Sequence, residues 1–139
     1  MQIDDFDTSR PVASVAELDH CLRTHRRGDF GAFILAHRDE GSSFWVLINQ
    51  DIAYLHFFIT MDGSHPGYQP TGMTPKGCPA TVHFLQTSGS EADSFDMVAE
   101  ALVSVEAAYV AAREYFSSDE LPHSVSWLEL WTNERDGVR

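Results

Sequence analysis

The sequence predicts a single α+β domain, with a mainly antiparallel meander sheet of about five or six strands and an N-terminal and a C-terminal helix packed on it. At 139 residues, of which 43% are apolar, the chain has the ordinary size and composition of one folded domain. Aromatic and branched segments follow one another through short polar connections, which favours antiparallel hairpins. We expect one domain over residues 1–139, with residues 1–12 and 132–139 flexible.

The first helix is predicted to begin after Ser14, because Glu17 follows three residues later in a capping-box pattern. Apolar residues then recur at helical spacing as far as Leu22, and three arginines near the end complement the helix dipole. Gly28 is the predicted stop, since glycine readily adopts the left-handed conformation that ends a helix.

Three strands are predicted next, at residues 31–37, 43–50 and 53–60, because these segments are rich in Phe, Trp, Val, Ile and Tyr. The short connections between them predict hairpins, so the strands should be antiparallel neighbours. Residues 53–59 are apolar on both faces, which predicts a central strand covered on each side.

The second half of the chain is predicted to contain two further strands, a helix and a short last strand. The strands lie at residues 80–87 and 95–103, although a helix that begins near Asp96 fits the second segment equally well. The helix is best started at Ser104, from which an alanine-rich apolar stripe runs to the aromatic pair that precedes residue 117. Residues 124–130 form the last strand.

A long loop at residues 61–79 separates the two halves of the predicted sheet. It is rich in Gly, Pro, Ser and Asp, which are typical of turns. Loops of this length in compact domains are usually functional or disordered. We therefore regard this loop as the first place to look for a binding site.

Charge is distributed unevenly along the chain, whose formal net charge is −12. Between Arg38 and Arg113, Lys76 is the single basic residue. The same stretch holds nine acids: Asp39, Glu40, Asp51, Asp62, Glu91, Asp93, Asp96, Glu100 and Glu106. A negative field of this kind repels nucleic acid and attracts cationic protein surfaces. We expect a cationic protein partner and no nucleic acid.

The beginning of the chain has acids where a signal peptide needs positive charge. No segment approaches the roughly 18 apolar residues of a membrane span. Two isolated cysteines, Cys21 and Cys78, fit a reducing compartment. These features predict a cytoplasmic protein that does not bind a membrane.

No motif in the sequence predicts catalysis or metal binding. The seven histidines lack the spacing of known metal sites, and no nucleophile has the surroundings that would activate it. The segment Ser88–Gly89–Ser90 resembles a phosphate cradle, but acids follow it and no lysine does. We predict no metal, no cofactor and no enzymatic activity.

An ordered set of motifs near the C-terminal end resembles a known family. The motifs are the segments 104–109 and 111–116, then Pro122 and the segment 127–130. They resemble the first-numbered family of bacterial immunity proteins in polymorphic toxin systems, which includes the partner of a double-stranded-DNA cytosine deaminase toxin. The resemblance covers roughly residues 30–130. It is looser in the middle, where Tyr54–Phe57, Gly67–Tyr68 and Gly72 match the family's aromatic strand and Gly-aromatic loop.

One departure from the family lies at the end of the second helix. Relatives often carry a glycine before the proline, whereas this chain has Ser117–Ser118–Asp119. The departure concerns how the helix ends, because a glycine there would adopt the left-handed conformation without strain.

The resemblance implies a stoichiometric inhibitor that covers the active site or substrate groove of a toxin. A toxin that acts on nucleic acid has a cationic groove, which an acidic partner complements. The expected partner is a cationic toxin domain, with a deaminase favoured and a nuclease second. We expect its contacts on the long loop and at a neighbouring acidic turn, with Tyr68 as the aromatic anchor, at Asp62, His65, Tyr68, Glu91, Asp93 and Asp96.

A second hypothesis stays open on the sequence alone. The chain could be a small-molecule-binding module or a cryptic enzyme, in which residues 61–79 form a lid over a pocket that contains His56 and His83. A metal or metabolite retained by the purified protein would favour this second hypothesis.

Overall fold

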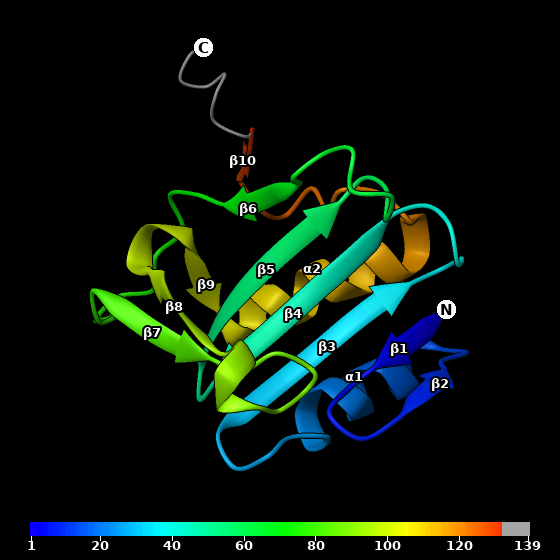
Figure 1. Ribbon diagram of the computed structural model, residues 1–139, viewed down its shortest axis with the longest axis horizontal. Coiled ribbons are helices and arrows are strands. Elements are labelled where there is room, and N and C mark those ends of the chain that lie inside the picture. Colours follow the sequence, from blue (N-terminus) through cyan, green and yellow to red (C-terminus); the bar gives the residue numbers. More distant parts are fainter. Residues whose placement is uncertain (132–139) are drawn as a thin grey trace.

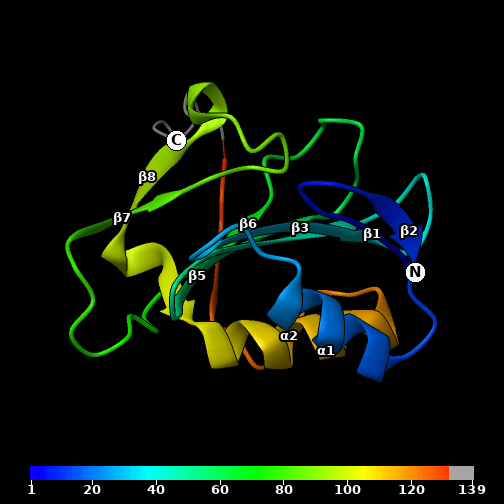
Figure 2. The same cartoon turned by 90° about the horizontal axis from the view of Figure 1, so that it is seen from below.

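The computed structural model describes residues 1–131, which form an α+β fold with its helices on one side of a sheet. The main sheet has eight strands in the order β10-β6-β5-β4-β3-β1-β2, and β9 also pairs with β5. Strands β7 and β8 form a separate two-stranded sheet on the opposite side from the helices (Figure 2). The predicted fold class is confirmed, although the sheet has more strands than expected.

The elements follow in an order that can be traced in Figure 1. Their bounds are β1 (Gln2–Asp4), β2 (Ser9–Pro11), α1 (Val15–Thr24), β3 (Phe30–Ala36), β4 (Ser43–Asn49), β5 (Ile52–Phe58), β6 (Tyr68–Pro70), β7 (Thr81–Phe84), η1 (Glu91–Asp93), β8 (Phe95–Val98), η2 (Ala99–Ala101), β9 (Leu102–Ser104), α2 (Val105–Ser118) and β10 (Trp127–Glu129). The predicted tail at residues 132–139 lies outside the described residues.

The predicted three-strand meander is confirmed as β3, β4 and β5, which pair antiparallel in chain order. Alternate residues of these strands, such as Phe33, Val46 and Leu55, face the two helices and are fully buried. The helices contribute Leu18 and Tyr115 to the same core. This packing follows from the period of two in the strands and the apolar stripes of the helices.

Residues 1–12, which we expected to be flexible, instead extend the sheet. Strand β1 pairs with both β2 and β3, and the side chain of Ile3 is completely buried. Val12 adds a second buried apolar side chain at the end of this hairpin. The prediction was wrong because strands of three residues are too short to show a periodic pattern.

Both helices begin as predicted, but they end differently. The Ser14 side chain accepts a hydrogen bond from the Glu17 amide at 3.2 Å, and Ser104 accepts one from the Ala107 amide at 3.1 Å. Helix α1 ends at Thr24, short of the predicted stop at Gly28.

Helix α2 ends at Ser118 and is capped by Asp119, which adopts the left-handed conformation with φ of 63°. The Asp119 carboxylate lies 2.9 Å from Arg38 and accepts a hydrogen bond of 2.6 Å from Ser42. These two contacts hold the strained residue in place.

The segment 95–103, expected as one strand or the start of a helix, is neither. Strand β8 ends at Val98, a 3-10 turn follows, and β9 begins at Leu102. Strand β8 pairs with β7, whereas β9 pairs with Ile52–Tyr54 of β5. The turn therefore carries the chain from the small sheet to the main one.

A second buried cluster lies between the main sheet and the β7–β8 hairpin. Ala32, Leu47 and Tyr54 of the main sheet pack there against Val82 and Phe84 of β7. This confirms that β5 is covered on both faces over its first half. Over its second half the described residues form a buried cluster on the helix side only, which leaves part of the sheet's outer face open.

Candidate protein-binding face

The predicted loop residues His65 and Tyr68 lie together with the last strand. The Nδ1 atom of His65 accepts a hydrogen bond of 2.8 Å from the Gly67 amide, so its Nε2 carries the proton and donates to Glu129 at 2.8 Å. The His65 ring stacks on Tyr68 with centroids 5.5 Å apart and meets the exposed Trp131 edge-on at 4.8 Å. Tyr68 is therefore packed in an aromatic cluster formed by the loop and the last strand.

Asp62 is fully exposed at the tip of the same loop. Its carboxylate accepts a hydrogen bond of 2.9 Å from the Ser64 amide. Hydrogen bonds from the side chain and backbone of Ser64 lower the pKa of Asp62, so this carboxylate is charged at neutral pH. It shapes the loop and still presents its charge to solvent.

Two of the three predicted acids of the second group flank His83 on the β7–β8 hairpin. Asp96 lies 2.7 Å from Nδ1 of His83, and Glu91 lies 3.1 Å from Nε2. Hydrogen bonds from His83 to Asp96 and then to Glu91 raise the pKa of the imidazole. Asp93 accepts a hydrogen bond of 2.7 Å from Ser88. These three acids hold the turn together.

The two predicted groups do not form one neighbouring surface, which corrects our expectation. Asn49, at the start of the β4–β5 turn, donates a hydrogen bond of 2.9 Å to the His83 carbonyl. Asp62 instead follows the far end of β5, which stops at Phe58. The groups therefore lie at opposite ends of β5 (Figure 1), and Tyr68 of the first group, which pairs with Phe57, packs against the core on the helix side.

The geometry also departs from the lid hypothesis. His56 lines a hollow of about 280 Å³, but His83 and residues 61–79 do not line it. The Nε2 of His56 donates to the Pro66 carbonyl at 2.8 Å, and its Nδ1 lies 2.8 Å from the Tyr54 hydroxyl. Burial lowers the pKa of His56, against the effect of the Pro66 bond. The neutral His56 ring therefore holds the 61–79 loop to the sheet, and neither of its nitrogens is free to bind a substrate.

The open part of the sheet's outer face carries a row of paired residues across four strands. Asp4 of β1 pairs with Ile34 of β3, Ile34 pairs with Trp45 of β4, and Trp45 pairs with His56 of β5. All four are only partly buried. Directly paired residues share one face of a sheet, so this row forms a continuous surface.

Two hollows adjoin along that row. The first, already described at His56, has walls formed by Trp45 and Phe58 of the main sheet and by Phe95 and Met97 of β8. The second measures about 490 Å³ and lies over β1 and β3, where Ile34, Met61, Asp4 and Asp39 are among its lining residues. The sequence did not single out these residues. The signal that could have found them is the alternation of β3 and β4, which leaves Ile34 and Trp45 facing away from the helices.

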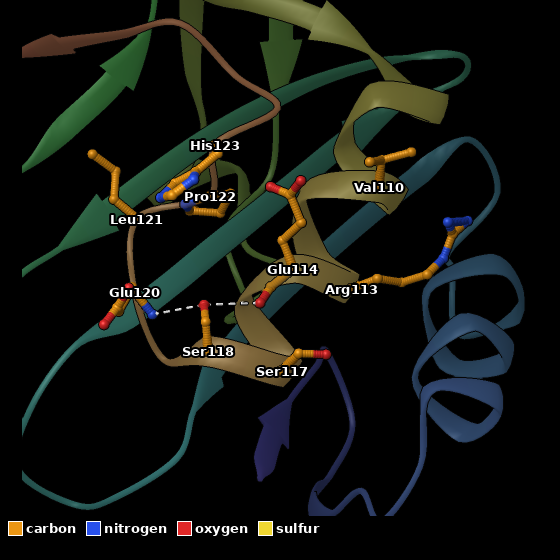
Figure 3. A pocket seen from close by; sticks show the side chains of 9 residues that line it. All are labelled: Val110, Arg113, Glu114, Ser117, Ser118, Glu120, Leu121, Pro122 and His123. Atoms are coloured by element: carbon orange, nitrogen blue, oxygen red, sulfur yellow. Dashed lines mark hydrogen bonds between the residues drawn. The ribbon is translucent and has the colours of Figure 1, made fainter.

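A further hollow of about 480 Å³ lies on the helix side, between α2 and residues 120–123 (Figure 3). Its polar groups serve to close the helix end. Ser118 donates to the Glu114 carbonyl at 2.9 Å and accepts from the Glu120 amide at 3.1 Å, as the dashed lines in Figure 3 show. Arg113 lies 3.3 Å from Asp19 of α1. This hollow is therefore the packing junction between α2 and the segment that follows it.

The basic side chains of residues 1–131 are almost all engaged within the protein. Each arginine contacts a carboxylate, a carbonyl, a hydroxyl or an aromatic ring. The pairs are Arg10–Asp5, Arg23–Tyr109, Arg26–Asp29, Arg26–Tyr109, Arg27–Asp7, Arg38–Asp119 and Arg113–Asp19. Within this described part of the chain, Lys76 is the basic residue that shows no such contact.

Comparison with known proteins leaves the family open: no model of a known protein family matches the chain, and a search of curated proteins finds no match. Among residues 1–131, no group of three or more His, Cys, Asp or Glu side chains is arranged to hold a metal ion. No helix within those residues has the length and apolar character needed to cross a membrane.

Proposed function

We propose that this chain is an immunity protein that binds a cationic toxin domain and neutralises it by covering its active site or substrate groove. The proposal joins the resemblance of residues 104–130 to bacterial immunity proteins with the charge of the folded molecule. The expected toxin is a nucleic-acid deaminase, with a nuclease second, and the inhibitor acts in the cytoplasm.

The observation that carries the proposal is the unequal use of charge. The arginine side chains of residues 1–131 are engaged in contacts within the protein, as described above. Many carboxylates of the same residues have no basic partner within ion-pair distance. The latter are Asp4, Glu17, Asp29, Asp39, Glu40, Asp51, Asp62, Asp93, Glu100, Glu106, Glu114 and Glu120. A surface with unpaired carboxylates attracts a cationic partner and accelerates its association.

The same charge disfavours other classes of partner. Nucleic acid carries a dense negative charge, and binding it requires free Lys or Arg. The proposed inhibition needs no chemistry from the inhibitor. A protein that occupies the cationic groove of a toxin excludes the substrate by position alone.

The test is co-expression with the toxin encoded beside this chain's gene, followed by a pull-down and a growth-rescue assay. We expect a stable complex and restored growth. An inactive toxin variant serves as the control, because it should bind equally well without affecting growth. Absence of both binding and rescue would reject the immunity assignment for that pair.

A further inference from the structure

We infer that the open outer face of the sheet, across β1, β3, β4 and β5, receives a segment of the partner that carries a large apolar side chain and, about 10 Å away, a Lys or Arg side chain. This inference rests on the proposed function, because it takes the cationic toxin as the partner. It identifies the contact face, which the proposal itself leaves open.

The hollow beside His56 has the chemistry of a site for an apolar side chain. Its walls are Trp45, Phe58, Phe95 and Met97, and its volume is about 280 Å³. The Tyr54 hydroxyl and the His56 ring that line it already have partners, since they are hydrogen-bonded to each other at 2.8 Å and the ring also donates to the Pro66 carbonyl. A polar group directed at these two side chains would therefore lose its contacts with water and gain none, whereas an apolar side chain packs well against the aromatic walls.

The strand register fixes where the charge lies relative to this hollow. Asp4 and Trp45 stand in one row, with Ile34 between them. Neighbouring strands are about 4.8 Å apart, so Asp4 lies about 10 Å from Trp45 along the row. A partner segment that crosses the strands in an extended conformation would reach both positions with side chains two or four residues apart, since such residues share one face and lie about 7 or 13 Å apart.

Two carboxylates near the apolar hollow are available to a cationic group of the partner. Asp4 and Asp39 line the second hollow and have no ion pair among the described residues. Arg38 also lines it, but its guanidinium is held by Asp119 at 2.9 Å. The complementary group on the partner is therefore a Lys or Arg.

The same carboxylates argue against a second copy of this chain on the open face. Self-association would bring two molecules, each with a net charge of −12, together through surfaces that carry Asp4 and Asp39. Like charges placed opposite each other disfavour association. Size-exclusion chromatography of the free protein tests this directly, and a dimer that Trp45→Ala abolishes would overturn the assignment of a cationic partner.

The binding test compares two variants of the open face with matched variants on the helix side. The test variants are Trp45→Ala and Asp4→Lys. Their controls are Val110→Ala, which alters a side chain 40% exposed on α2, and the charge reversal Glu120→Lys beside it. Dissociation constants and association rates are measured with the purified cognate toxin domain, and unfolding midpoints confirm that each variant is folded.

We expect Trp45→Ala to weaken binding about 30-fold or more, as for an interface hot spot. Asp4→Lys should slow association about tenfold at low salt, with a smaller effect at high salt. The two controls should stay within about threefold of the wild type. Because Asp4→Lys changes a partly exposed side chain, it tests the face even if Trp45→Ala fails to fold.

The outcomes distinguish an error in the assigned contact face from an error in the proposed function. If the wild type binds and rescues while both test variants behave like the controls, the face is wrong and the immunity function stands. If the helix-side controls lose binding instead, the contact lies on α2. If the wild type neither binds nor rescues, the proposed function fails and this inference fails with it.

Discussion

Asp5 shows how a single carboxylate organises the N-terminal hairpin. Its side chain is 3% exposed and accepts hydrogen bonds of 2.9 Å from the amides of both Asp7 and Thr8. Arg10 lies 3.2 Å and His25 lies 3.0 Å from the same carboxylate. Burial acts to raise the pKa of Asp5, but these bonds outweigh it and the pKa is lowered.

Replacing Asp5 by Ala should therefore lower the free energy of unfolding by about 2–4 kcal/mol, because it leaves several partly buried donors without an acceptor. Urea unfolding at neutral pH measures the change. Asp4→Ala is the matched control on the same strand and should change stability by no more than about 0.5 kcal/mol. Equal effects of the two substitutions would contradict the role assigned to Asp5.

The depressed pKa of Asp5 also has a pH consequence. Its stabilising contribution is complete above the unfolded-state pKa, near the ordinary value of 3.8, and is lost as the pH falls through the lower folded-state pKa. Asp5→Asn removes the titrating group, so its stability should fall less over this acid range.

His83 titrates in the opposite direction. Its raised pKa means that the stabilisation from Asp96 and Glu91 is complete below the unfolded-state pKa, near 6.5, and is lost as the pH rises through the folded-state value. We expect an NMR titration to give a His83 pKa above 6.5. Asp96→Asn should lower that pKa more than Glu91→Gln, since the Asp96 bond has the larger effect. An unshifted pKa would show that the turn does not depend on this ring.

At the scale of elements, one glycine joins the long loop to the sheet. Gly67 has φ of +98°, and a Cβ atom there would lie 2.5 Å from Nε2 of His56 and 2.6 Å from the Phe57 carbonyl oxygen. Its own carbonyl accepts a hydrogen bond of 2.9 Å from Leu130. The close approach therefore positions the loop, β6 and the end of β10 together.

Gly67→Ala should destabilise the protein by about 2–4 kcal/mol, because both the backbone angle and the space oppose a side chain. Gly72→Ala is the matched control: its φ is +73°, but a Cβ there meets nothing within 4 Å. The control should cost only about 1 kcal/mol, from backbone strain alone. Thermal and urea unfolding distinguish the two, and equal losses would show that crowding at Gly67 is unimportant.

The elements that could be predicted are those with long patterns. The β3–β5 meander and both helix starts follow from alternation, short turns and serine caps. The short strands β1, β2 and β6 carry too little pattern, and no local signal indicates that β7 and β8 leave the main sheet. The separation of Asp62 from Glu91 could not be predicted either, because it depends on which end of β5 each segment meets.

At the scale of the whole molecule, most basic side chains of residues 1–131 are engaged in contacts within the protein, whereas many carboxylates are exposed to solvent. Asp62 remains charged at the loop tip, while Asp4 borders the open face. Such a distribution sets the rate at which a cationic partner arrives more than the lifetime of the complex. The free energy of folding depends on it less, since exposed charges contribute little each.

The association rate with the cognate toxin should fall at least about tenfold between about 50 mM and 500 mM NaCl, with a much smaller change in the dissociation rate. Stopped-flow or surface-binding kinetics measure both. Lys76→Glu is a useful companion variant, because this exposed lysine has no contact to lose among the described residues and should leave the unfolding midpoint unchanged. A salt-independent association rate would contradict electrostatic steering.

One edge of β5 pairs only with strands that come later in the chain, which matters while the chain is being synthesised. One edge of β5 meets β4, while β9 and β6 share the other, at Ile52–Tyr54 and at Phe57 respectively. Because β9 ends at Ser104, a growing polypeptide that stops earlier leaves part of a central strand without its partner. Unpaired edges of apolar strands recruit other chains, so ribosome stalling or proteolysis before this point should produce aggregates and not a smaller folded protein.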